Sequence, residues 1–60
     1  MKAGEEYIHK MDNTRYMKLI KYLGRDIWRI DVWYNQKYTP WSRTTGSGRN
    51  ILQDFRKIGA

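Results

Sequence analysis

Cysteine is absent from this chain of 60 residues, and histidine occurs once, as His9. Without cysteine there is no disulfide and no thiolate metal site, so stability has to come from the packing of aromatic and aliphatic side chains. Long apolar runs are absent too, because no stretch approaches the roughly 18 consecutive apolar residues that a membrane-spanning helix needs. These absences exclude a disulfide scaffold, a cysteine-based zinc site and a helical membrane span.

The beginning of the chain has no apolar segment of the kind found in secretory signals. Residues 1–6 are mostly charged or small, so we expect an unprocessed protein of the cytoplasm, a reducing compartment that suits a chain without disulfides. A chain of this length forms one domain at most and buries only about 60% of the surface that its unfolded form exposes. We therefore expect residues 1–60 to form a single small β-rich domain with a marginal core.

Acidic residues are scarce relative to basic ones. Twelve lysines and arginines stand against six aspartates and glutamates, which gives a formal net charge of +6 at pH 7. A positive field favours encounter with polyanions, of which nucleic acid is the obvious candidate. A net charge of about 2 to 8 also keeps a small domain in solution, so charge alone leaves both interpretations open.

Groups that could perform catalysis are few. Catalysis needs paired groups with tuned pKa values, whereas the six carboxylates are scattered among lysines and arginines. Glu5 and Glu6 are adjacent, and adjacent residues of a strand point to opposite faces. His9 has no second histidine and no nearby carboxylate pair to complete a metal site. We predict a protein that is not an enzyme and that needs no metal and no organic cofactor.

The clearest expected element is a strand over residues 27–34, where the pattern has a period of two. One set of alternate residues is Trp28, Ile30, Val32 and Tyr34, and the other is Arg29, Asp31 and Trp33. Such alternation predicts a half-buried strand. We expect the first set to face the core and the second set, Trp33 included, to face solvent.

Three further strands are predicted around this one. Residues 6–11 and 16–23 are rich in β-forming side chains, and the Gly24-Arg25-Asp26 turn should close a hairpin onto residues 27–34. Residues 38–44 are expected to form a fourth strand. Proline cannot donate to a ladder of hydrogen bonds, so Pro40 marks an edge strand or a bulge there.

A short helix is predicted near the C-terminus. After a flexible loop at Gly46-Ser47-Gly48, Asn50 can cap a helix and Gln53 can complete a capping box. The apolar stripe of this helix would consist of Ile51, Leu52, Phe55 and Ile58, with Gly59 as the C-terminal stop. A helix of about eight residues is not stable alone in water, so it must dock on the sheet.

Four short antiparallel strands with a C-terminal helix suit a small SH3-like barrel or a three-stranded sheet backed by one helix. The second arrangement occurs in the arm-site DNA-binding domains of phage-type integrases. Gly4-x-x-Tyr7, the early meander and Ile51-x-x-x-Phe55 resemble small SH3-like proteins, phage-encoded ones among them. The resemblance implies a mostly β fold of the barrel type, and it implies nothing about function.

The predicted binding surface combines aromatic rings with basic side chains. It comprises Arg29, Trp33, Tyr38, Trp41, Arg43, Arg49, Arg56 and Lys57. A base stacked on an exposed ring contributes about 1 to 3 kcal/mol, and arginines neutralise phosphates. Asp31 works against this function because a carboxylate repels phosphate. Alternatively, Trp33 or Trp41 caps an open barrel end and the charges form a solvated face.

The segment Gly46-Ser47-Gly48-Arg49 resembles a phosphate-cradling loop, since glycines expose backbone N–H groups and a helix N-terminus follows. It lacks the spacing of a nucleotide-hydrolysing P-loop. Binding of one backbone phosphate and a turn without a ligand are both compatible with it.

These features predict a small basic nucleic-acid-binding domain of low sequence specificity, which grips phosphates and stacks bases on Trp33 and Trp41. The alternative is a phage-like modulator or inhibitor that docks on an acidic protein surface through the same residues, because Trp, Tyr and Arg are enriched at interaction hot spots. An enzyme is the third class. The choice of DNA or RNA and the oligomeric state stay open, and neither a membrane nor a small-molecule partner is expected.

Overall fold

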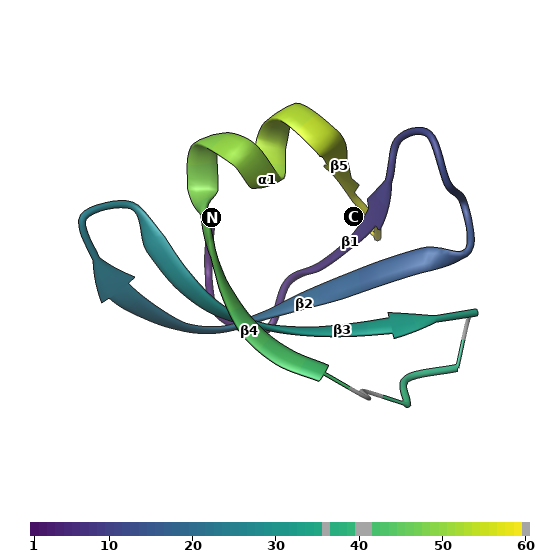
Figure 1. The fold of residues 1–60 in the computed structure, drawn as a ribbon, viewed down its shortest axis with the longest axis horizontal. Coiled ribbons are helices and arrows are strands. Elements are labelled where there is room, and N and C mark those ends of the chain that lie inside the picture. The colour runs from purple at the N-terminus through teal and green to yellow at the C-terminus, as the bar shows by residue number, and fades with distance from the viewer. Residues whose placement is uncertain (36, 40–41, 60) are drawn as a thin grey trace.

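A computed structural model describes residues 1–35, 37–39 and 42–59. These residues form five antiparallel strands in one open sheet and one short helix (Figure 1). The elements are β1 (Glu6–His9), β2 (Arg15–Gly24), β3 (Ile27–Tyr34), β4 (Ser42–Ser47), α1 (Gly48–Asp54) and β5 (Phe55–Lys57). The order across the sheet is β4-β3-β2-β1-β5. The mostly β prediction is confirmed, but the sheet has five strands rather than four or three, and no closed barrel is shown.

The hairpin between β2 and β3 turns where the sequence predicts it. Arg25 and Asp26, the two residues between the strands, have φ values of 53° and 63°. Positive φ at both central residues gives a turn whose twist matches that of the flanking strands. Register shifts between Leu19 and Lys21 and between Tyr22 and Gly24 mark β2 as irregular near this turn, and such irregularities increase the local twist.

One side of the sheet, which we call the inner face, is covered by α1 (Figure 1). Its core consists of Tyr7, Met17, Leu19, Trp28, Ile30 and Ile51, with Val32 and Phe55 packed against it. Trp28 and Ile30 are therefore buried, as the alternation in β3 predicts. Tyr34, assigned to the same core, is 42% exposed, so that prediction is wrong at the end of the strand.

The opposite side, the outer face, also has a buried cluster. Ile8, Tyr16 and Trp33 form it, with Ile58 packed against them. Trp33 is only 1% exposed, and so is Asp31, so the prediction that these side chains face solvent is wrong. A period of two shows which residues share a face but not whether that face is wet, and here the outer face is buried around Trp33 and exposed around Arg29.

The C-terminal helix is displaced from its predicted position. α1 begins at Gly48, and its N-cap is Ser47, whose hydroxyl accepts a hydrogen bond from the N–H of Asn50 at 3.1 Å. The expected cap at Asn50 is thus wrong. Residues 55–57 leave the helix and pair with β1 as β5, because the free edge of β1 offers these backbone groups a ladder. Gly59 therefore follows a strand rather than a helix.

Other predicted boundaries shift by a few residues. β1 ends at His9 rather than residue 11, and β4 begins at Ser42 rather than residue 38. Gly46 and Ser47, expected in a flexible loop, belong to β4. Pro40, predicted to mark an edge or bulge, lies outside the described residues. Within the described ranges, no helix has the length and apolarity that crossing a bilayer requires.

Candidate nucleic-acid interface

Basic side chains from neighbouring strands meet on the outer face. Residues directly opposite each other in antiparallel strands point to the same side of the sheet. One row across the outer face consists of Lys21, Arg29 and Thr45. The next row consists of Glu6, Lys18, Asp31 and Arg43. The sheet register therefore gathers cations from β2, β3 and β4 on one surface.

Lys21 and Arg29 form an exposed pair on this surface. Both side chains are exposed and directly opposite across β2 and β3. Among the described residues no carboxylate forms an ion pair with either of them. Like charges in such positions destabilise a sheet. This pair is thus a concentration of positive charge that the protein itself leaves uncompensated.

Asp31, in the next row, is neutralised inside the protein. Arg43 donates to both carboxylate oxygens, from Nε at 2.7 Å and from Nη2 at 3.2 Å, and the hydroxyl of Tyr38 donates at 2.8 Å. The hydrogen bond from Arg43, aided by that from Tyr38, lowers the pKa of Asp31. The same contacts raise the pKa values of Tyr38 and Arg43. Asp31, the carboxylate expected to repel phosphate, is therefore neutralised by Arg43 and buried.

Tyr38 covers this part of the outer face. Its ring packs edge-on against Trp33, with 4.8 Å between ring centroids, and the Nζ atom of Lys18 lies 4.9 Å from the centre of the Tyr38 ring. The ring of Tyr16 also stacks on Trp33, with 5.8 Å between ring centroids and nearly parallel planes. Tyr38 is 44% exposed, so it is the ring of this cluster that faces solvent.

The structure brings together only some of the predicted site residues. Arg29, Tyr38 and Arg43 share the outer face, and Arg56 reaches its far edge opposite Ile8. Trp33 is too deeply buried to stack on a base. Trp41 lies outside the described residues.

The other two predicted cations lie elsewhere. Lys57 is opposite Tyr7 and so points to the inner face, where its ammonium forms an ion pair with Glu5 at 2.9 Å. Arg49 belongs to α1, which covers the inner face. Neither is part of the outer-face surface.

The predicted phosphate cradle at Gly46–Arg49 is occupied by the protein's own aspartate. The N–H of Arg49 donates to the Asp26 carboxylate at 3.0 Å, and the N–H of Gly48 donates to the Asp26 carbonyl oxygen at 2.7 Å. The Ser47 hydroxyl accepts a hydrogen bond from the N–H of Asn50. The backbone N–H groups of Gly48, Arg49 and Asn50 at the start of α1 therefore all have partners within the protein. Because the tip of the β2–β3 hairpin folds against the helix, these N–H groups already have partners within the protein, which favours the alternative without a ligand.

Two site residues, Lys18 and Lys21, are missed by the sequence reasoning. They are three positions apart, so in a regular strand they would point to opposite faces. The register shift between Leu19 and Lys21 turns both onto the outer face. The sequence signal is limited to the lysines themselves, because nothing in residues 15–24 specifies where the irregularity occurs.

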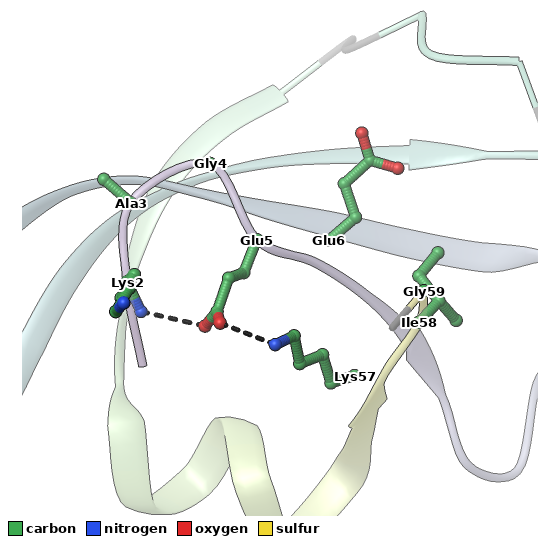
Figure 2. Close-up of a pocket in the computed structure, with 8 residues that line it drawn as sticks. All are labelled: Lys2, Ala3, Gly4, Glu5, Glu6, Lys57, Ile58 and Gly59. Atoms are coloured by element: carbon green, nitrogen blue, oxygen red, sulfur yellow. Dashed lines mark hydrogen bonds and ion pairs between the residues drawn. The ribbon is translucent and has the colours of Figure 1, made fainter.

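A second feature is a pocket of about 630 Å³ lined by residues 2–6 and 57–59. Figure 2 shows Lys57 and the backbone N–H of Lys2 converging on the Glu5 carboxylate, while Glu6 points away. The hydrogen bond from Lys57, followed by that from Lys2, lowers the pKa of Glu5 from 4.5 to about 2. Glu5 is thus an internally satisfied anion, and it makes no carboxylate pair with Glu6.

Two further findings bear on the chemistry of the site. In the part of the chain that the structure describes, no three His, Cys, Asp or Glu side chains cluster in a way that could hold a metal ion. Comparison of the chain with protein-family models, with curated proteins and with solved structures gives no match. The function therefore has to be argued from the outer face itself.

Proposed function

We propose that this protein binds the phosphate backbone of nucleic acids through the outer face of its sheet. The opposed pair of Lys21 and Arg29 carries the proposal. Two like charges held across neighbouring strands cost stability, and a polyanion that lies over them removes the repulsion. The pair is easier to explain as a binding element than as a stabilising one.

Neighbouring cations extend this surface. The side chain of Arg43 is 61% exposed although it is bonded to Asp31, and a guanidinium has five N–H donors, so some remain for a phosphate. Lys18 lies in the same row, and Arg56 lies at the β5 edge of the same face. Several phosphate contacts of this kind make binding strongly dependent on salt.

Stacking on Trp33 has no place in this proposal, because the ring is buried and in contact with Tyr16 and Tyr38. Phosphate contacts position a protein on nucleic acid but carry little sequence information. The expected specificity for sequence is therefore low. The location that fits the proposal is the cytoplasm, and the proposed activity is binding without a chemical step.

An SH3-like barrel is the fold that we propose for the same domain. α1 joins the two edge strands, β4 and β5, and contacts both of them. The helix thus connects the two ends of the sheet across its inner face, as in a small barrel, and none of the described residues bonds to the outward backbone groups of β4. This fold is compatible with many functions, so the proposal of nucleic-acid binding stands on the charges alone.

The experiment is a titration of labelled single-stranded and double-stranded DNA and RNA oligonucleotides, followed by fluorescence anisotropy at about 50 and 200 mM salt. We expect affinity to fall steeply with salt, with a slope of roughly 0.7 to 0.9 per phosphate contacted. The double variant Lys21→Gln/Arg29→Gln should bind more weakly and show a smaller slope.

The matched control is Lys2→Gln/Arg49→Gln, which removes the same charge away from the outer face. It should keep most of the affinity. If the folded protein binds none of the oligonucleotides, or if the two double variants lose affinity equally, the proposal is wrong and net charge alone accounts for any binding.

A further inference from the structure

β4 has one free edge. Its other edge pairs with β3 from Ser42 to Ser47 in continuous register, and β4 is the last strand on this side of the sheet. None of the other described residues bonds to its outward backbone groups. In an antiparallel ladder every second residue directs its N–H and C=O away from the neighbouring strand. Half of the peptide groups of β4 therefore face outward without a protein partner from the described chain.

The features that usually block an exposed edge are missing from β4. Natural edges are protected by short strands, prolines, bulges or projecting charges. β4 has six residues, no proline and no register shift against β3. Its one charged side chain, Arg43, is turned onto Asp31. The opposite edge strand, β5, has only three residues, so β4 is the edge that can accept another strand.

The exposed charges around this edge are positive. Arg43 lies on β4, Arg29 lies on the neighbouring strand, and Arg49 lies in the first turn of α1, directly after β4. The carboxylates nearest to them are already engaged, Asp31 by Arg43 and Asp26 by the start of α1. A strand added here would therefore meet a positive border on the outer face and at the end of β4.

We infer that β4 pairs with an extended acidic segment of a partner protein, which joins the sheet as a further strand. Main-chain hydrogen bonds supply affinity in this mode of recognition, and alternate side chains supply specificity. Here the alternate side chains on the outer face would be carboxylates beside Arg43. A second copy of the chain is disfavoured as the occupant because it carries the same charge of +6. This site uses the edge of the sheet and does not rest on the proposed binding of nucleic acid.

The first test uses a soluble 12-residue peptide of alternating glutamate and threonine, with a lysine-threonine peptide as its matched control. Binding is measured by isothermal titration, and backbone amide signals are followed by NMR. We expect the acidic peptide to bind at least about tenfold more tightly than the basic one. The largest amide shifts should fall in residues 42–47.

The second test asks whether the peptide backbone forms the ladder. Two versions of the acidic peptide carry N-methyl groups, one on every threonine and the other on every glutamate. One set of N–H groups faces β4 and the other faces solvent, so one version should keep the parent affinity and the other should lose at least about tenfold. Equal affinity of the two versions would overturn the inference.

The remaining outcomes separate this inference from the proposed function. The Lys21→Gln variant should bind nucleic acid more weakly but the acidic peptide as well as the wild type does, because Lys21 lies on β2, two strands from β4. If an oligonucleotide rather than the peptide shifts the amides of residues 42–47, the edge belongs to the nucleic-acid site and the inference is wrong. Concentration-dependent shifts of the same amides in the protein alone would identify a second copy as the occupant and would also overturn it.

Discussion

Gly48 lies where the tip of the β2–β3 hairpin meets the start of α1. A Cβ atom at this position would lie 2.5 Å from Oδ1 of Asp26, a distance at which the aspartate has to move. That aspartate holds the N–H groups of Gly48 and Arg49. The glycine is therefore required by a contact between two segments far apart in sequence.

We predict that Gly48→Ala lowers the free energy of unfolding by about 1 to 3 kcal/mol, the usual cost of forcing an extra methyl group into a packed contact. Gly46→Ala is the control, because its Cβ would meet Ile30 and Ile51 at ordinary distances of 3.6 to 3.8 Å. Urea unfolding measures both variants. Equal stability of the two variants would show that residue 48 does not lie as close to Asp26 as described.

Glu5 is one residue whose ionisation should make stability depend on pH. The pKa of Glu5 is lowered to about 2, chiefly by the hydrogen bond from Lys57. A carboxyl whose pKa is depressed in the folded state stabilises it above the ordinary pKa and loses that contribution as the pH falls through the folded value. The contribution of Glu5 is therefore present above about pH 4.5 and lost towards pH 2.

The thermal unfolding midpoint of the wild type should accordingly fall between about pH 4.5 and pH 2 by more than that of the Glu5→Gln variant. Melting curves followed by circular dichroism in this range test the expectation. Parallel pH profiles for the two proteins would show that Lys57 does not hold the carboxylate in solution.

The apolar stripe predicted for one C-terminal helix is divided between α1 and β5. Of this stripe, Ile51 in the helix and Phe55 in the strand pack on the inner-face core. Leu52 is 53% exposed and Ile58 packs on the outer face, so the prediction is wrong for these two residues. The chain changes to a strand at Phe55 because His9, Ile8 and Tyr7 of β1 provide partners for residues 55–57. Backbone pairing with a distant strand therefore decides where the helix ends.

The observed helix has Ser47 as its N-cap, whereas the predicted helix has Asn50. Ser47→Ala removes the hydroxyl that accepts from Asn50 and should cost about 1 kcal/mol, the typical value for losing an N-cap. Asn50→Ala should be nearly neutral, since Asn50 contributes its backbone N–H and that group is retained. Chemical denaturation of both variants checks this. A larger loss for Asn50→Ala would favour a helix that begins at residue 51.

For the whole molecule, stability and the proposed function compete on the outer face. Lys21 and Arg29 face each other with like charge, and a cross-strand ion pair at the same place would be more favourable. A binding surface can retain such a cost, because functional sites often break the local rules of stability.

Lys21→Glu should therefore raise the free energy of unfolding by about 0.2 to 1 kcal/mol and should weaken binding to oligonucleotides at low salt. Lys2→Glu, with the same change of charge away from the outer face, is the control. Urea unfolding and fluorescence anisotropy on the same preparations give both quantities. Unchanged affinity in Lys21→Glu would show that this pair makes no phosphate contact.

The amino-acid sequence by itself determined the class of fold, the β2–β3 hairpin and the positive charge. Alternation at Trp28 and Ile30 and the turn at Arg25-Asp26 depend on neighbouring residues, and local patterns report such features directly. The sequence also contained the basic residues of the candidate surface, although not which of them lie together.

Tertiary structure alone decided which face each functional side chain occupies and whether it is reachable. Trp33 is buried because Tyr16 and Tyr38 pack against it, and Asp31 is neutralised by Arg43, twelve residues away. Lys18 and Lys21 share the outer face only because β2 is irregular against β3. These outcomes depend on register and on contacts between distant segments, whereas a periodic pattern describes one strand at a time.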